Sequence, residues 1–495
     1  MIALPCLLYS MDLTVLNLAV PALSADLRPS GTQLLWIIDI YGFFVAGSLI
    51  TMGTLGDRIG RRRLLLIGAA AFGVGSILAA FSTSAAMLIA TRALLGLAGA
   101  TLAPSTLSLI RNMFHHPAQR TLAIGVWISS YSAGAAIGPL IGGVLLEHFW
   151  WGSVFLIGVP VMVLLLVLGP LLLPEFRDPG AGRLDLLSAG LSLIAVLSMI
   201  YGLKGIAVSG RPWPSVVFVL VGSGLAFVFV RRQAALADPL IDLRLFRSPS
   251  FTAAVVTYSL ATFVGFGIYI FIAQYLQLVL GLSPLQAGLW TAPFALAFIL
   301  GSLVTPAIVR RTHPARVMTA GLAMAAVGFA LLTQVGNTSG LPVLVTGLIV
   351  YSLGLAPVFT LSNDVILGIA PPARAGAAAA LSETGSELGG ALGIAVLGSI
   401  GAAFYRSRVM DRAPPAIPGE AIVAARDTLG AALAVGEKLS GRLGMELIAV
   451  AREAFTSSLR LTAVVSAAFV LTLAIATARY LRPEAGTAGQ SASPR

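Results

Sequence analysis

The chain has 495 residues, of which 57% are hydrophobic and 10% are charged, and its mean hydropathy is +0.94. Soluble domains carry roughly 25% charged residues, so this composition excludes an ordinary soluble protein. The net charge of +11 would fit a nucleic-acid partner only if the basic residues formed a solvated patch. They cluster instead at alternate junctions between apolar segments, which indicates that the charge reflects membrane topology.

Apolar runs of about 20 residues, each long enough to cross a hydrocarbon core of ~30 Å, follow one another along the chain. We predict that fourteen segments span a membrane as helices, so the expected fold class is an all-α polytopic membrane protein. The first segment contains Asp12 and has no basic region before it, which favours a retained helix over a cleaved signal. The segments lie near 2–23, 32–54, 63–82, 84–112, 120–146, 152–173, 184–203, 213–231, 250–278, 284–309, 315–335, 340–368, 374–404 and 456–481.

Two polar stretches, 174–183 and 232–249, set the seventh and eighth segments apart from two outer groups of six. The second segment of each group ends in a glycine-bearing stretch followed by arginines, "GTLGDRIGRRR" and "GSLVTPAIVRR", so the groups form a weak repeat. Duplicated parallel halves with a site between them are typical of transporters. The predicted organisation is an N-terminal six-helix bundle (1–173), a linker with two helices (174–249), a C-terminal six-helix bundle (250–481) and a tail (482–495).

One long connection, residues 405–455, is predicted on the outer side. Its stretches "GEAIVAARDTLGAALA" and "GRLGMELIAVAREAF" have helical apolar spacing, which favours a short helical hairpin over the outer face; a loose linker is the alternative. The arginine-rich junctions lie on the opposite side. The positive-inside rule therefore predicts that both termini are cytoplasmic.

Six charged residues are candidates for burial deep within the predicted spans, where a charge near the bilayer centre costs roughly 2.5–3.5 kcal/mol and marks a functional candidate. Arg92 is the only base among them, and because arginine does not readily lose its proton it needs a counter-charge. We expect Asp12 to be its partner, with a purely structural ion pair as the alternative. The six residues are Asp12, Asp39, Arg92, Asp364, Glu383 and Glu387.

Glu383 and Glu387 stand four residues apart, which places them on one helix face with Cβ atoms ~5–6 Å apart. Two carboxylates this close and away from water cannot both ionise cheaply, so the pair would hold a proton and release it when water or a cation arrives. A proton–cation exchanger needs this behaviour. The alternative is that Glu387, or both, lie at a wet helix end. The position of Asp39 is equally consistent with an outer vestibule and with a structural role. The position of Asp364 near a helix end favours a structural role.

Glycines recur at four-residue spacing in "SAGAAIGPLIGG" (132–143), a pattern that lets helix backbones approach closely. Pro139 removes a backbone donor and is expected to kink this helix. The sequence carries no G-x-x-x-x-G-K-[ST] phosphate loop, and its four histidines lack the spacing of metal ligands. We therefore expect neither an enzyme nor a metal or other cofactor.

Several of these stretches together resemble one family, the major facilitator superfamily, and within it the fourteen-helix drug:proton antiporters. The similar stretches are "MDLTVLNLAVPAL" (11–23), "WIIDIYGFFVAGSLI" (36–50), "GTLGDRIGRRRLLL" (53–66), "TRALLGLAGA" (91–100), "GAAIGPLIGG" (134–143) and "ARAGAAAALSETGSELGGALGIAVLGSI" (373–400). They occur in order over nearly the whole chain. The resemblance implies two six-helix bundles with two extra helices between them.

The resemblance also implies a function: a multi-pass inner-membrane exporter that works by alternating access and is driven by inward proton flow. Its cargo would be amphipathic, mainly cationic drugs, and the chain would act as a monomer; a dedicated exporter of one antibiotic or metabolite is the alternative.

The family's residue roles carry over onto the matching positions of this chain. Asp12 and Glu383 would be the leading proton and substrate carboxylates, with Asp39, Glu387 and Asp364 as further candidates and Arg92 assisting the proton step. Asp57 would brace a helix N-terminus at a cytoplasmic gate. The gate motif comprises Gly53, Asp57, Arg58, Gly60 and Arg61, and the antiporter motif comprises Gly134, Gly138, Pro139, Gly142 and Gly143.

Overall fold

The structure is a computed structural model that describes residues 2–29, 31–177, 185–208, 212–236, 239–336, 340–414, 416–439 and 441–480. The predicted tail therefore lies outside the described residues. The N-terminal helices are α1 (Ala3–Leu27), α2 (Gly31–Ile59), α3 (Arg61–Ala80), α4 (Ala85–Met113), α5 (Pro117–His148), α6 (Ser153–Leu156) and α7 (Gly158–Leu172). Two helices, α8 (Leu186–Val208) and α9 (Pro212–Ala235), and the 3₁₀ turn η1 (Leu243–Arg247) follow.

The C-terminal helices begin with α10 (Pro249–Gln274), which continues as the π-helical turn η2 (Tyr275–Val279). The remaining elements are α11 (Pro284–Val309), α12 (Pro314–Leu332), α13 (Gly340–Ile369), the 3₁₀ turn η3 (Pro372–Arg374), α14 (Ala375–Arg412), α15 (Gly419–Ala425), α16 (Leu429–Lys438) and α17 (Arg442–Tyr480). Below, the N-terminal half means α1–α7 and the C-terminal half means α10–α17.

The predicted spans correspond to helices of the structure. Within the described residues, 13 helical segments are long and apolar enough to cross a membrane, and they coincide with the second to fourteenth predicted spans. The first predicted span coincides with α1, and α6 and α7 together form the sixth. The all-α prediction is confirmed.

Local sequence signals fix where several helices begin. The Ser84 hydroxyl accepts the backbone N–H of Met87 at the start of α4, and Ser283 forms a capping box with Gln286 at the start of α11. Between α2 and α3, Gly60 has a φ of 109°, a conformation that favours glycine. The sharp break at Gly60 lets the arginines of α3 follow directly after Asp57.

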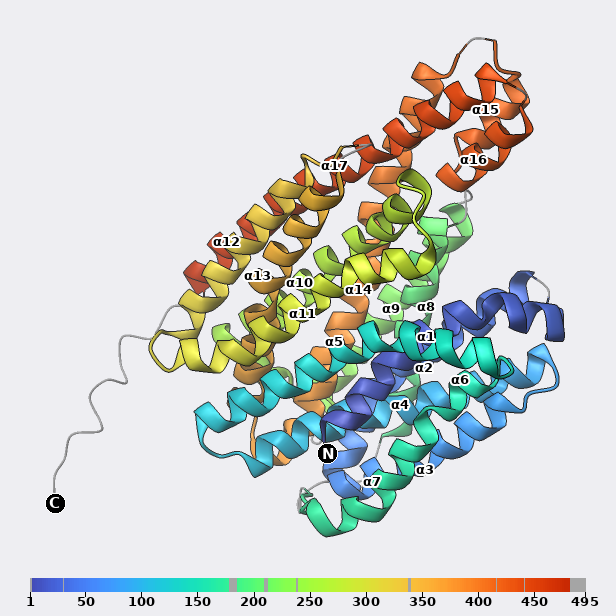
Figure 1. Ribbon diagram of the computed structural model, residues 1–495. Helices are drawn as coiled ribbons and strands as arrows, with labels where there is room; N and C mark the ends of the chain where they lie inside the picture. Colours follow the sequence, from blue (N-terminus) through green and yellow to red (C-terminus); the bar gives the residue numbers. More distant parts are fainter. Residues whose placement is uncertain are drawn as a thin grey trace, which may run out of the picture.

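Each half has its own apolar core. One buried cluster runs from Leu8 to Leu173 and adds Ala380, and the other runs from Ala261 to Ala474. In Figure 1 the N-terminal half, in blue to teal, lies beside the C-terminal half, in light green (α10) through yellow to red, and the two groups of helices diverge toward the end at which α15 and α16 lie.

The two intervening helices lie along one seam between the halves. Buried side chains of α8, among them Val196 and Ile200, pack in one cluster with Phe43 of α2 and with Ala391 and Ala395 of α14. Figure 1 shows α8 and α9 next to these helices. The α2–α14 seam is therefore covered by α8, whereas α5 and α11 meet along the opposite seam, where Gly125 of α5 faces the Ser302 carbonyl of α11.

The long connection is helical, but its arrangement differs from the predicted hairpin. The first predicted stretch forms α15 and α16, whereas the second is the beginning of α17, which starts at Arg442 instead of 456. Likewise α14 continues to Arg412 instead of ending at 404. Ion pairs support these polar extensions: the Arg412 and Glu453 side chains lie 2.5 Å apart between α14 and α17, and Arg442 pairs with Glu446 four residues along. A loose linker is excluded for this region.

Candidate functional site

The predicted pairing of Asp12 with Arg92 is present in the N-terminal half. Asp12 lies midway along α1, and Arg92 Nη1 is 2.5 Å from Asp12 Oδ2. Arg92 is only 1% exposed, and its Nε donates to the carbonyl of Ile37 on α2. Its guanidinium carbon also lies 4.7 Å from the centre of the Tyr41 ring. The Phe155 ring centre lies 5.8 Å from the same carbon. A buried guanidinium is thus held by one carboxylate, one carbonyl and two aromatic rings.

Asp12 also borders a small cavity. The cavity has a volume of about 20 Å³ and lies between α1, α3 and the α6–α7 region, where Phe72 and Phe155 line it. A volume of this size holds about one water molecule. Asp12 therefore has both a charged partner and room for a water beside it.

Glu383 and Glu387 lie half-buried on α14, and each accepts a hydrogen bond from a tyrosine. Tyr258 of α10 donates to Glu383 Oε1 over 3.1 Å, and Tyr9 of α1 donates to Glu387 Oε1 over 2.8 Å. The first bond stays within the C-terminal half, whereas the second crosses between the halves. Neither hydroxyl brings a positive charge to its carboxylate.

Aromatic rings connect this pair of carboxylates to Arg92, a feature that the sequence analysis missed. The Tyr9 ring centre lies 6.1 Å from that of Tyr41 and 5.9 Å from that of Tyr131, with interplanar angles of 41° in both cases. These three tyrosines come from α1, α2 and α5, and we call them the tyrosine row. Arg92 lies over Tyr41 at one end of the row, and Glu387 accepts its hydrogen bond from Tyr9, the middle member.

The gate motif joins α2 to the beginning of α14. Asp57 Oδ1 and Oδ2 accept the backbone N–H groups of Gly376 and Ala377 over 3.0 and 2.9 Å. Asp57 also pairs with Arg61 at 2.7 Å, and Arg61 donates to the carbonyls of residues 372 and 373. The expected bracing of a helix N-terminus by Asp57 is therefore present, with a favourable charge at the positive end of the α14 dipole.

The close approach of α2 and α14 depends on glycines. A Cβ added at Gly53 would lie 2.4 Å from the Gly376 carbonyl oxygen, and one added at Gly376 would lie 2.5 Å from Asp57 Oδ1. The conformation of Gly60 and the buried position of Arg61 complete the motif. Arg58, the remaining predicted member, is half-buried near the end of α2.

Asp364 takes part in a second bridge between the halves. Arg120 Nε lies 2.6 Å from Asp364 Oδ1, and the Thr121 hydroxyl donates to Oδ2 over 2.7 Å. Nearby, Arg111 Nε donates to the carbonyl of Leu367 over 2.6 Å. These contacts tie α4 and α5 to α13, so Asp364 belongs to the same end of the molecule as the gate motif. We call this the arginine-rich end.

An apolar cluster fills the space between the halves near this end and contains the single cysteine of the chain. Cys6 of α1 is 3% exposed and packs among residues of α4, α5, α13 and α14. Leu367 and Ala379 are the members from the C-terminal half. We call it the cross-half cluster. Together with the two polar bridges, it closes the two halves against each other here.

The antiporter motif packs α5 against α1. A Cβ added at Gly134 would lie 2.2 Å from the Leu7 carbonyl oxygen, and one at Gly142 would lie 2.9 Å from a Val15 methyl. Gly138 is buried, whereas Gly143 faces open space. The same geometry recurs between α14 and α10, where Gly389 and Gly393 face backbone carbonyls. Pro139 lies within α5, which is one continuous helix in the structure.

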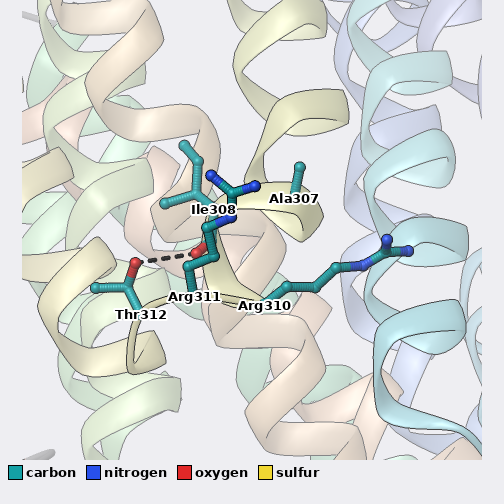
Figure 2. A pocket seen from close by; sticks show the side chains of 5 residues that line it. All are labelled: Ala307, Ile308, Arg310, Arg311 and Thr312. Carbon is teal, nitrogen blue, oxygen red and sulfur yellow. Dashed lines mark hydrogen bonds between the residues drawn. The ribbon is translucent and has the colours of Figure 1, made fainter.

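The repeat of the gate motif in the C-terminal half has a different structure. Figure 2 shows the end of α11, where Arg310 and Arg311 extend in different directions beside an open hollow of about 530 Å³. The Thr312 hydroxyl donates to the Ile308 carbonyl over 3.0 Å, which closes the helix locally. The stretch 301–312 contains no acid that could cap a helix of the other half, so the two repeats are not equivalent.

Asp39 is half-buried on α2, one turn after Trp36. The Trp36 ring stacks on that of Tyr201 of α8, with ring centres 6.1 Å apart. Within the described residues, no three His, Cys, Asp or Glu side chains are grouped as a metal site would require.

Comparison with known proteins places these features in one family. A protein-family model described as "Major Facilitator Superfamily" matches residues 3–394. The chain belongs to this superfamily. It is 45% identical over 473 residues to the multidrug efflux pump LfrA of Mycolicibacterium smegmatis, which covers 96% of this chain and 94% of that protein. It is 37% identical to the methyl viologen resistance protein SmvA of Salmonella typhimurium, with 90% of each chain covered.

A solved structure supports the major facilitator fold. The crystal structure of the human organic anion transporter MFSD10 superposes with a TM-score of 0.61 at 17% identity, covering 95% of this chain and 98% of that one. At this identity the likeness concerns the fold alone. The family match over most of the chain makes this protein a transporter and not an enzyme, as predicted.

Proposed function

We propose that this major facilitator is a proton-coupled efflux antiporter, which exports amphipathic, mainly cationic compounds by alternating access. The observation that carries the proposal is the contrast between the acids inside the helices. Asp12 is balanced by a buried arginine, whereas the hydrogen bond to Glu383 comes from the neutral hydroxyl of Tyr258. A proton or a cationic cargo would bring a positive charge to Glu383, and competition between the two would couple their movements.

The Asp12–Arg92 pair is the proposed proton step of the N-terminal half. Protonation of Asp12 would release the guanidinium, which would then rely on the Ile37 carbonyl and the Tyr41 ring. The water-sized cavity beside Asp12 has room for one water, which would pass a proton to the carboxylate. Asp39, nearer the predicted outer end of α2, would belong to the outer vestibule.

Alternating access requires that the contacts at the arginine-rich end open and close. In the proposed topology this end is cytoplasmic, both termini lie in the cytoplasm, and a monomer in the cell membrane moves its bundles 1–173 and 250–481 against each other around the helices of 174–249. Asp57, Arg61 and the Arg120–Asp364 bridge would hold the cytoplasmic side shut while the acids are reached from outside.

The relatives support export and a cationic cargo. LfrA is named a multidrug efflux pump, and SmvA is named for resistance to methyl viologen. Methyl viologen is an aromatic dication. A carboxylate pair bordered by aromatic rings suits cargo of this chemistry.

A vesicle assay tests the proposal. Inverted membrane vesicles that contain the chain should take up a monovalent cationic dye only when a proton gradient is imposed, and collapse of the gradient should release it. Glu383→Gln should fold yet lose this gradient-driven uptake, whereas Glu437→Gln, a change at an exposed glutamate of α16, should retain it. Unchanged proton-coupled uptake by Glu383→Gln would remove the proposed exchange site.

A further inference from the structure

The segment between α9 and α10 lies against both halves of the molecule. We call residues 239–247 the strap; they include the 3₁₀ turn η1. Leu240 of the strap is 1% exposed and packs in one buried cluster with Ile50 of α2 and Phe229 of α9. Leu381 of α14 packs against the same cluster. The strap is therefore part of the packed interior and not a loose connection.

The strap begins at a fixed point on the two intervening helices. Gln233 of α9 is 2% exposed, and its side-chain oxygen accepts the backbone N–H groups of Leu240 and Ile241 over 2.7 and 3.4 Å. Its side-chain nitrogen donates to the Ser188 hydroxyl of α8 over 2.8 Å. Breaking these bonds would leave buried polar groups unpaired, so the backbone of the strap is held in one register against α8 and α9.

One hydrogen bond joins the strap to the N-terminal half. The Thr54 hydroxyl of α2 donates to the Leu240 carbonyl over 3.1 Å and shares its proton with the Ile50 carbonyl of its own helix at 2.9 Å. Thr54 stands one turn before Asp57, which accepts backbone N–H groups at the beginning of α14. The strap therefore meets α2 directly beside the gate motif.

More contacts join the strap to the C-terminal half. Asp242 Oδ2 lies 3.7 Å from Nη1 of Arg374, the residue that directly precedes α14. Leu245 packs against a second buried cluster, which is formed by side chains of α10, α13 and α14. The Thr252 hydroxyl of α10 donates to the Phe246 carbonyl over 2.9 Å. A separation of the halves would therefore leave the strap with the C-terminal half and break its bond to α2.

The two ends of the strap flank the contacts of the gate motif. Thr54 precedes Asp57 on α2, and Arg374 lies between the carbonyl of residue 373, which Arg61 binds, and the N–H of Gly376, which Asp57 binds. Any movement that separates Asp57 from α14 also separates Thr54 from the strap. The strap and the gate motif therefore respond to the same displacement of α2 against α14.

We propose that the strap is part of the gate: it stabilises the closed arginine-rich end by connecting α2 to the beginning of α14, and Thr54 is the residue that it releases when this end opens. The inference rests on the alternating access of the proposed function. It gives the intervening helices α8 and α9 a task in the transport cycle, because Gln233 and Ser188 hold the strap in position.

Labelling of Cys6 by N-ethylmaleimide tests the strap in the purified full-length chain, in lipid nanodiscs without cargo or a proton gradient. Cys6 is buried in the cross-half cluster, so its labelling rate follows the fraction of molecules that are open at this end. Thr54→Val removes the donor to the Leu240 carbonyl and should accelerate labelling about 2- to 12-fold, the effect of one neutral hydrogen bond on the closed state. Ile50→Val weakens the same contact by one methyl group and takes the place of Thr54→Val if that variant does not fold.

Two matched variants separate a gate contact from ordinary stability. Thr252→Val also removes a hydroxyl that donates to a strap carbonyl, but that bond stays within the C-terminal half. Thr54→Ser keeps a hydroxyl on α2. Labelling of both should stay within about 1.5-fold of the unchanged chain, because neither change removes a bond between the halves. Thr54→Val and Thr252→Val should lower the melting temperature by similar amounts, since each loses one hydrogen bond; a role in structure alone would make labelling follow the melting temperature.

The outcomes separate this inference from the proposed function. The strap is refuted as part of the gate if Thr54→Val is labelled at the rate of the unchanged chain, or if Thr252→Val or Thr54→Ser accelerates labelling as much as Thr54→Val does. Proton–cation exchange by the unchanged chain in vesicles would still stand in that case. Conversely, the expected labelling pattern in a chain that exchanges no protons for cargo would support the strap and refute the antiport.

Discussion

Replacing Asp57 by Asn should open the arginine-rich end, and the single native cysteine can report it. Asp57 uses both carboxylate oxygens to accept the backbone N–H groups of Gly376 and Ala377 across the two halves. Its bond with Arg61 lies within one half and persists in either state, so only the cross-half bonds count. Each hydrogen bond to a charged group contributes about 1.5–3 kcal/mol, and Asn keeps one neutral bond of about 1 kcal/mol.

The closed state should therefore lose about 2–5 kcal/mol relative to the open state. This loss raises the open fraction roughly 30- to 5,000-fold while that fraction stays small. Cys6 is buried in the cross-half cluster and becomes accessible only when the halves separate there. Its labelling by N-ethylmaleimide, followed by mass spectrometry, should accelerate by a similar factor.

Asp185→Asn is the matched control. Asp185 also accepts backbone N–H groups at a helix start, that of α8, and also pairs with an arginine, Arg232, at 2.8 Å. Both of its partners lie in the α8–α9 pair, away from the seam at Cys6. Labelling of Cys6 in this variant should remain within about twofold of the unchanged chain. Equal labelling rates for Asp57→Asn and Asp185→Asn would refute the account of the gate.

Three other predictions follow from single contacts. Gly134→Ala should lower the melting temperature, because the new Cβ would lie 2.2 Å from an α1 carbonyl and would force α5 away from α1. Gly143→Ala is the control and should leave the melting temperature unchanged, because no atom lies within 4 Å of its Cβ. Equal melting temperatures for the two variants would refute the packing argument. Asp12→Asn leaves a buried guanidinium without its counter-charge, so coupled transport should be lost while protein is still made, and normal drug resistance would contradict this. Hydrogen bonding from Ser188 holds the pKa of Asp185 below its usual value. The ionised Asp185 therefore stabilises the fold above about pH 4, and this contribution is lost as the pH falls through the lowered pKa. The melting temperatures of the unchanged chain and of Asp185→Asn should therefore converge in acid.

Charge and glycine patterns predicted the parts of the site that follow from local rules. Arg92 needed a counter-charge, and Asp12 lies in the middle of a predicted span, so their pairing could be expected. Asp57 directly precedes an arginine cluster and a glycine break, and its place beside a helix N-terminus could be expected from the family resemblance. Each of these two inferences depends on a single strong interaction between a charged group and its partner.

The tyrosine contacts could not be predicted from a single sequence. Tyr9 and Glu387 are separated by 378 residues, and nothing in the residues around Tyr9 distinguishes it from an ordinary core aromatic. The Arg120–Asp364 bridge has the same difficulty: both residues were visible as charges, but their pairing depends on how α5 and α13 pack. Hydropathy also could not find the true ends of α14 and α17, because ion pairs such as Arg412–Glu453 continue these helices beyond their apolar stretches.

Coupling can be measured most directly by letting the cargo drive the proton. In liposomes that contain the purified chain and no imposed pH gradient, a gradient of tetraphenylphosphonium should move protons in the opposite direction, as a pH-sensitive dye inside the liposomes would record. The account predicts this counter-movement for the unchanged chain and its loss in Glu383→Gln. Passage of the cation without any proton movement would contradict exchange at the carboxylates of α14.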